Sequence, residues 1–254
     1  MYILYLIFIN ICYTMYILKI KYLEGYMKLE VIVTTLKEAI DAEKAGADRV
    51  ELITGVNEGG LTPSLALIEK VCDILTIPVN IMVRPHAMSF CYDEFDKEVI
   101  LRDVELISNT KANAIVFGAL DNNNNIDIDL LQRVISKKGD KLLTFHRAFD
   151  KLENQKEGID ILSKFDVDMV LTSGGKDSAI DAVVQINKLA EHAKGKIKIL
   201  AGSGIKATNI HRFLDVCGPD EVHAGSGAKD NNSNYGNINY DKISTLKSHF
   251  KFKK

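Results

Sequence analysis

The chain has 254 residues, of which 46% are hydrophobic and 26% are charged, and its formal net charge at pH 7 is −2. A chain of this length can bury a substantial core without disulfides or metal ions. The near-neutral charge lacks the basic excess typical of nucleic-acid-binding proteins and gives no steering toward an anionic membrane. We therefore expect no nucleic-acid partner.

Residues 1–26 differ in character from the rest. Residues 1–18 carry no charge and are mostly Ile, Leu, Tyr, Phe and Met. This apolar N-terminal extension has three interpretations: a short membrane anchor near the lower limit of spanning length, an inert extension, or a start-site artefact with translation beginning at Met27. The third is favoured because a strand opens directly at Met27. We expect the extension to lie outside the fold, with membrane contact only if it is translated.

From residue 27 onward one pattern repeats: an apolar strand, a polar or Gly-rich loop and an amphipathic helix. The first helix runs from Leu36 to a glycine cap at Gly46, and the second opens at Thr62-Pro63-Ser64. The sixth helix is predicted over residues 177–193. The eight predicted strands span residues 28–33, 49–53, 79–83, 114–117, 142–146, 168–172, 198–201 and 221–224.

Eight strands alternating with helices, without a break in composition, predict a single (β/α)8 TIM barrel over residues 27–254. The alternative is a doubly wound open sheet, which typically has fewer units and a dinucleotide fingerprint after its first strand. Val33-Thr34-Thr35 offers no such fingerprint.

The ligand site of such a barrel lies at the C-terminal ends of its strands. Alternation along the strands directs six polar side chains inward near these ends: Glu30, Glu51, Arg84, His146, Thr172 and His223. Arg147 and Asp150 follow in the loop past His146. Charged groups that converge on one mouth are costly to bury unless they are paired or used. The structural alternative is an internal Glu51–Arg84 bridge with hydrogen-bonded core histidines.

Glycine-rich turns follow the last strands. Gly202-Ser203-Gly204 and Gly225-Ser226-Gly227 occupy the place where barrels often bind phosphate. Ser173-Gly174-Gly175 extends this phosphate-binding loop, and Arg84 or Arg147 supplies the countercharge. The sequence thus predicts a site for a small anionic ligand.

Four residues are candidate general acids or bases: Glu30, Glu51, His146 and His223. Epimerisation, isomerisation or hydrolysis of a phosphorylated substrate fits these residues, and nothing selects among the three. Aldol cleavage through a Schiff base is disfavoured because no lysine ends a predicted strand.

Several segments together resemble one family, in order along residues 27–227. They are Leu29-Glu30-Val31, Ala47-Asp48-Arg49-Val50-Glu51-Leu52, Glu58-Gly59-Gly60-Leu61-Thr62-Pro63-Ser64, Val83-Arg84-Pro85, Val116-Phe117-Gly118-Ala119-Leu120, Thr144-Phe145-His146-Arg147-Ala148-Phe149-Asp150 and Leu171-Thr172-Ser173-Gly174. The family is CutC. The resemblance implies a TIM barrel, a cytoplasmic location, a homo-oligomer and a part in copper homeostasis.

Copper is implied by this resemblance alone. Some members carry cysteines at the end of the first strand and just after the glutamate of the second, and these positions correspond here to Ile32 and Ile53. Isoleucine cannot bind a metal, so the soft ligands suited to Cu(I) are missing and we predict no metal ligands. Cys91 alone would not make a site. Two hypotheses remain: a copper-binding protein of copper homeostasis, and an enzyme acting on a small anionic substrate.

Overall fold

The computed structural model describes residues 27–250, so the expectations for residues 1–26 lie outside the described residues. Eight parallel strands form a closed barrel in which each pairs with the next and β8 pairs with β1. They are β1 (Lys28–Val33), β2 (Arg49–Leu52), β3 (Val79–Met82), β4 (Ala114–Phe117), β5 (Leu142–Phe145), β6 (Met169–Thr172), β7 (Lys198–Ala201) and β8 (Glu221–Ala224). The predicted single (β/α)8 barrel is confirmed.

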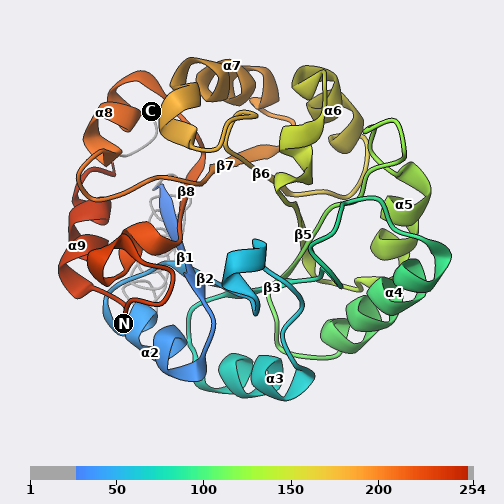
Figure 1. Ribbon diagram of the computed structural model, residues 1–254, viewed down its shortest axis with the longest axis horizontal. Coiled ribbons are helices and arrows are strands. Elements are labelled where there is room, and N and C mark those ends of the chain that lie inside the picture. The colour runs from blue at the N-terminus through green and yellow to red at the C-terminus, as the bar shows by residue number, and fades with distance from the viewer. Residues whose placement is uncertain (1–26, 251–254) are drawn as a thin grey trace, which may run out of the picture.

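Helices form a ring around this barrel (Figure 1). They are α2 (Leu36–Lys44), α3 (Leu65–Ile74), α4 (Glu94–Ser108), α5 (Ile128–Lys137), α6 (Gln155–Leu162), α7 (Val183–Ala193), α8 (Ile210–Val216) and α9 (Tyr240–Ser248). Short 3₁₀ helices interrupt the loops: η1 (Val56–Glu58), η2 (Arg147–Lys151), η3 (Ala179–Ala182), η4 (Ser226–Ala228) and η5 (Asp230–Asn232). Within residues 27–250 no helix is both long and apolar enough to cross a membrane.

The predicted element boundaries differ slightly from those observed. Three strands end one residue earlier than predicted, at Leu52, Met82 and Phe145, although the next residue still donates one ladder-like backbone hydrogen bond; His146 N, for example, lies 2.9 Å from Phe117 O. The sixth strand begins one residue later than predicted. The predicted sixth helix is divided into η3 and α7, because Ser178 caps a separate 3₁₀ turn before the α-helix begins.

Strand β1 shows how the sheet separates its two faces. Leu29, Val31 and Val33 are fully buried in the apolar core shared with the helices. The alternate residue Glu30 is in register with Arg49 of β2 and His223 of β8. Since residues in register on neighbouring strands point to the same side, these three polar side chains share one layer inside the barrel.

Candidate active site

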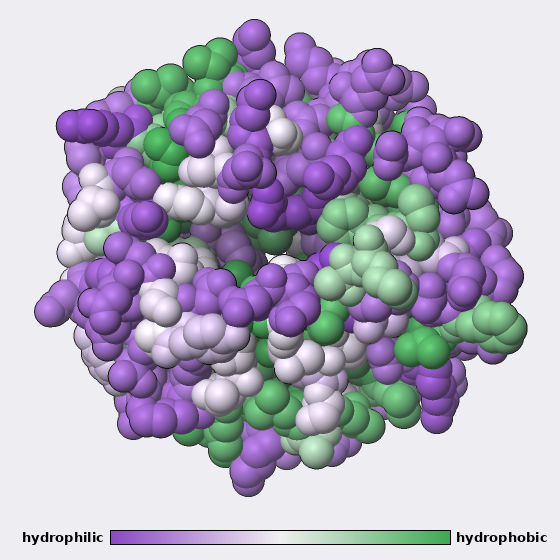
Figure 2. Space-filling view, in the orientation of Figure 1, coloured by the Kyte–Doolittle hydropathy of each residue, from purple (hydrophilic) through white to green (hydrophobic). Residues whose placement is uncertain are grey.

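A cavity of about 280 Å³ opens at the C-terminal ends of the strands. The space-filling view shows a hollow at the centre of the molecule, with largely hydrophilic residues around it (Figure 2). Five acidic, basic or histidine side chains from the predicted set line the cavity: Glu51, Arg84, His146, Arg147 and His223. Its apolar wall includes Ile32, Ile53, Met82, Phe90 and Leu171. The fold therefore brings most of the predicted titratable residues into one space.

Glu30 lies deeper, in the layer beneath the cavity, and does not line it. Its Oε2 accepts hydrogen bonds from Arg49 Nε at 2.5 Å and from Asn80 Nδ2 at 2.8 Å, and its Oε1 lies 2.8 Å from His223 Nδ1. Arg49 also pairs with Glu221, at 2.7 Å. Sequence reasoning missed Arg49 and Asn80. Alternation could have found Arg49, because it lies two residues before Glu51 on the same face of β2.

The charge of Glu30 is stabilised by these partners. Burial by itself raises the pKa of a carboxyl group, but the positive charges of Arg49 and His223 and their hydrogen bonds outweigh it. The pKa of Glu30 consequently falls to about 2. Glu30 is therefore a permanent anion at neutral pH, and its position suits it to hold His223 in place.

Glu51 and His223 face each other at the floor of the cavity. Glu51 Oε2 lies 3.8 Å from His223 Nε2, and Glu51 Oε1 is buried with no hydrogen-bond partner among the described residues. Burial raises the pKa of Glu51 to about 7, against the opposing charge of His223. Burial lowers the pKa of His223, but the charges of Glu51 and Glu30 outweigh it and the net shift is upward. Such a pair can exchange a proton near neutral pH.

His146 differs from His223 in its electrostatic setting. Its ring is buried and lies 5.1 Å from the ring of Phe90, and Nδ1 accepts a hydrogen bond from the Ala148 N–H at 3.2 Å. Nε2 has no partner within residues 27–250. Burial, aided by the charges of Arg84 and Arg147, lowers the pKa of His146 to about 3. At neutral pH the imidazole is therefore uncharged.

Arg84 contributes a buried positive charge to the cavity. It forms no ion pair with any residue in the described part of the chain; instead, one guanidinium nitrogen donates to the carbonyl oxygens of Glu58 at 2.9 Å and Gly60 at 3.3 Å. The guanidinium lies 4.8 Å from the Phe90 ring centre, and its Nε is buried without a partner. The predicted alternative of a Glu51–Arg84 bridge is therefore wrong. A buried cation without a countercharge is costly unless an anion joins it.

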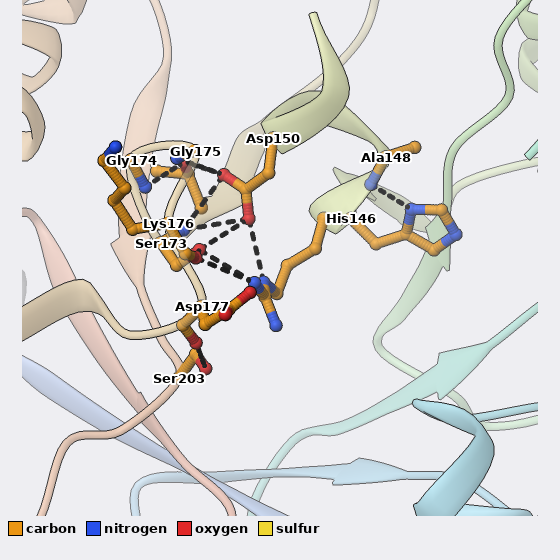
Figure 3. Close-up of polar contacts among 11 residues, drawn as sticks. His146, Ala148, Asp150, Ser173, Gly174, Gly175, Lys176, Asp177 and Ser203 are labelled. Carbon is orange, nitrogen blue, oxygen red and sulfur yellow. Dashed lines mark hydrogen bonds and ion pairs between the residues drawn. The ribbon is translucent and has the colours of Figure 1, made fainter. Parts of the chain in front are cut away.

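Asp150 is the centre of a polar cluster that includes Ser173 and Gly175 (Figure 3), and Arg147, which lines the cavity, is bonded to it. Asp150 accepts hydrogen bonds from Arg147 Nε at 2.8 Å, from Thr172 Oγ1 at 2.5 Å and from the Ser173 backbone N–H at 3.1 Å. Arg147 also donates to Ser173 Oγ at 2.8 Å. Thr172 and Ser173 do not line the cavity. The structure thus directs these two hydroxyl groups toward Asp150.

The glycine-rich turns after β7 and β8 form another side of the cavity. Ser203, Gly204, Gly225, Ser226 and Gly227 line it, whereas Gly202 does not. The turns are in direct contact, because a Cβ atom on Gly227 would lie 1.9 Å from the carbonyl oxygen of Ile205. Ser203 adopts a left-handed conformation with φ of 75°, which few residues other than glycine accept. In barrels of this type, phosphate sites are frequently formed by the loops after the seventh and eighth strands, which is where these turns lie.

These features define the chain as a (β/α)8 barrel with a glutamate–histidine pair and a buried arginine in its C-terminal mouth. The sequence profile of the CutC family matches residues 27–228, and the chain belongs to this family. A protein from Photorhabdus laumondii that is named as a CutC family protein is 39% identical to this chain over 199 residues. The matched region is 78% of this chain and 79% of that protein.

Solved structures agree with this assignment. The crystal structure of a CutC protein from Streptococcus agalactiae is 28% identical, with a TM-score of 0.74, and covers 78% of this chain and 97% of that chain. An N-(5'-phosphoribosyl)anthranilate isomerase from Pyrococcus furiosus has a TM-score of 0.57 at 17% identity, covering 88% of this chain and 98% of that one. The second likeness shows a shared fold alone.

The residues around the cavity do not suit copper. In the part of the chain that the structure describes, no three His, Cys, Asp or Glu side chains are arranged to hold a metal ion. Ile32 and Ile53, the two positions at which the family resemblance led us to look for cysteine, line the cavity as apolar side chains. Cys91 Sγ donates to the carbonyl oxygen of Asp121, and Cys72 and Cys217 are buried in the core. This donor set lacks the thiolates that Cu(I) prefers.

Proposed function

We propose that the chain is an enzyme that performs acid–base chemistry on a small anionic, phosphorylated substrate bound in the barrel mouth. The observation that carries this proposal is the Glu51–His223 pair. Glu51 is buried, lines the cavity, has one carboxylate oxygen without a hydrogen-bond partner among residues 27–250, and has a pKa raised to about 7. A carboxyl group whose pKa is near the working pH both accepts and returns a proton efficiently.

Arg84 supports the anionic nature of the substrate. Its guanidinium is buried at the cavity wall and forms no ion pair within the described range. A phosphate or carboxylate oxygen would supply the missing countercharge and accept from the unpartnered Nε. The turns containing Ser203, Gly204, Gly225 and Ser226 lie on another wall of the same cavity and would contact the anion there.

Most of the other candidates also have a place in this proposal. Glu51 transfers the proton, and His223 holds the Glu51 carboxylate and shares its charge. Glu30 is a positioning residue that orients His223 from below. Arg147 reaches the cavity, and Thr172 and Ser173 support it through Asp150. Isomerisation, epimerisation and hydrolysis all need this kind of proton transfer.

The proposal is tested by incubating the protein with sugar phosphates in D₂O. NMR would detect deuterium on the carbon next to a carbonyl group, or on a carbon whose configuration has been inverted. Released phosphate would reveal hydrolysis. We expect one of these reactions in the native protein and a loss of at least a hundredfold in Glu51→Gln, with substrate binding retained. A matched exposed variant, Glu191→Gln, should react at the native rate. Equal rates in the native protein and Glu51→Gln would contradict the assignment.

Copper handling is the other hypothesis, and it rests on the family's association with copper homeostasis. The cavity offers Met82 as a sulfur ligand but no cysteine. Cu(I) titration of the native protein and of Cys91→Ser tests this hypothesis. Binding tighter than that of free thiols, lost in Cys91→Ser, would favour copper; we expect no such binding. The cytoplasmic location and the homo-oligomer stay predictions from the sequence.

A further inference from the structure

The hydrogen bond at His146 determines which ring nitrogen carries the proton. Nδ1 accepts from the Ala148 N–H, so in the neutral ring the hydrogen is on Nε2 (Figure 3). His146 points away from the Asp150 cluster in this view. Because Nε2 is buried and has no partner in residues 27–250, it is a hydrogen-bond donor without an acceptor. An unsatisfied buried donor of this kind destabilises the protein until an acceptor binds to it.

Packing prevents the ring from turning toward another partner. A Cβ atom on Gly118 would lie 2.4 Å from His146 Nδ1, so the backbone of β4's C-terminal end lies directly against the ring. Phe90 and Phe145 contact it at ring-centre distances of 5.1 and 6.3 Å. The residue is 3% exposed and lines the same cavity as Glu51 and Arg84. Its free N–H is therefore oriented by the fold before any ligand binds.

We propose that His146 donates this Nε2–H to the carbonyl oxygen of the substrate, and that the substrate is a small phosphorylated aldehyde or ketone with a C–H bond next to its carbonyl. This inference rests on the proposed function and narrows its substrate class. It also changes the predicted role of His146 from acid or base to a hydrogen-bond donor that keeps its proton.

The chemistry of the cavity favours a carbonyl group over other acceptors. Arg84 already supplies a positive charge for the phosphate group of the substrate. The neutral His146 is therefore better suited to an uncharged substrate oxygen that gains negative charge during the reaction. Glu51 can remove a proton only from an acidified carbon, and a polarised carbonyl group provides that acidity. The low pKa of His146 keeps the imidazole a neutral donor throughout. Donors aimed at a developing oxyanion typically contribute 10²–10³-fold in rate.

The proposed step balances without a cofactor. The Glu51 carboxylate takes the proton from the carbon next to the carbonyl. The C–H electron pair becomes a C=C bond, and the C=O π pair moves to the oxygen held by His146 Nε2–H. Return of a proton from Glu51 to carbon restores the carbonyl compound. In D₂O the protonated Glu51 exchanges with solvent, and deuterium reaches the carbon.

The inference is tested with two carbonyl probes, ribulose 5-phosphate and dihydroxyacetone phosphate, and two reduced counterparts, ribitol 5-phosphate and glycerol 3-phosphate. His146→Gln places an amide N–H near the position of Nε2–H, whereas His146→Leu removes the donor. We expect His146→Gln to keep at least a tenth of the native deuterium exchange rate and His146→Leu to lose a hundredfold or more. Equal loss in both variants would mean that the ring transfers the proton, and a rate within threefold of native in His146→Leu would also overturn the inference.

Two further measurements separate this inference from the proposed function. Tighter binding of the carbonyl probes than of their reduced counterparts supports it, and equal binding of both overturns it while leaving the anion site intact. If neither the four probes nor inorganic phosphate binds, both the proposed function and the inference fall. Imidazole ¹⁵N NMR of the native protein needs no variant: Nε2–H with no titration down to pH 5 is expected, and protonation near pH 6.5 would contradict the geometry.

Discussion

Glu30 Oε1 and His223 Nδ1 lie 2.8 Å apart, across the pairing of β1 with β8 that closes the barrel. This contact directs the opposite ring nitrogen of His223 toward Glu51, at 3.8 Å. The three side chains come from the first, second and last strands and are all buried. Closure of the barrel is therefore what assembles the three residues that we propose for proton transfer.

Replacing Glu30 with Gln should destabilise the fold. The change removes the charge that Arg49 and His223 share, and breaking a buried ion pair typically costs about 3–5 kcal/mol. Because Glu221 still pairs with Arg49, we expect a loss of about 3 kcal/mol in the free energy of unfolding at pH 7. Urea denaturation of the native protein and of Glu30→Gln measures this loss.

The pH dependence of this effect has a definite sign. The pKa of Glu30 falls from 4.5 to about 2 on folding, so its stabilisation is present above pH 4.5 and is lost as the pH falls toward 2. The difference between native protein and Glu30→Gln should shrink over that range. The exposed Lys111–Asp73 pair provides the control, and Asp73→Asn should be indistinguishable from native at pH 7. A Glu30→Gln variant as stable as native would contradict the role of this network.

Glu51→Gln should lose activity and gain relative stability at high pH. The pKa of Glu51 rises from 4.5 to about 7, so its contribution is fully present below pH 4.5 and is lost as the pH rises through 7. The shift corresponds to up to about 3 kcal/mol. Since Gln cannot ionise, the unfolding free energy of the variant should increase relative to native between pH 5 and pH 8. Parallel pH curves for the two proteins would show that Glu51 is not held as a neutral acid.

Arg84→Met should weaken phosphate binding. Hydrogen bonds to charged groups contribute about 1.5–3 kcal/mol, so we expect the Kd for inorganic phosphate to rise roughly 10–100-fold. Isothermal titration calorimetry measures it, with Arg102→Met as a control because that side chain is 61% exposed and belongs to an i,i+3 pair on α4. An unchanged affinity in Arg84→Met would remove Arg84 from the anion site.

Gly227→Ala should separate the two glycine-rich turns. The new Cβ would lie 1.9 Å from Ile205 O, and a backbone atom cannot move aside cheaply. We expect a stability loss of about 1–3 kcal/mol and at least tenfold weaker phosphate binding. Gly195→Ala is the control: its φ is 75° but nothing lies within 4 Å, so about 1–2 kcal/mol of backbone strain should leave phosphate binding unchanged. Equal effects on binding in both variants would contradict the role of this contact.

The architecture was readable from the sequence because the strands of this barrel are buried on both faces. Most appear as short runs rich in apolar residues, such as Ala114–Phe117, and a glycine or polar loop follows them. Residues 142–145 illustrate the limit: the sequence pattern predicts a strand that is one residue too long, because His146 donates one more backbone hydrogen bond but is already the N-cap of η2. Boundaries of this kind depend on the neighbouring strand and are invisible in the segment itself.

The sequence by itself also determined which side of each strand faces the barrel interior, so Glu51, Arg84, His146 and His223 could be assigned to the mouth. Only the tertiary structure decided their depth and partners. The register places Ile32, and not Glu30, beside Glu51, so Glu30 lies in the layer below. Thr172 turns to Asp150, 22 residues away. Side-chain alternation is a local property of the strand, whereas depth, burial and hydrogen bonding depend on the stagger of the closed barrel.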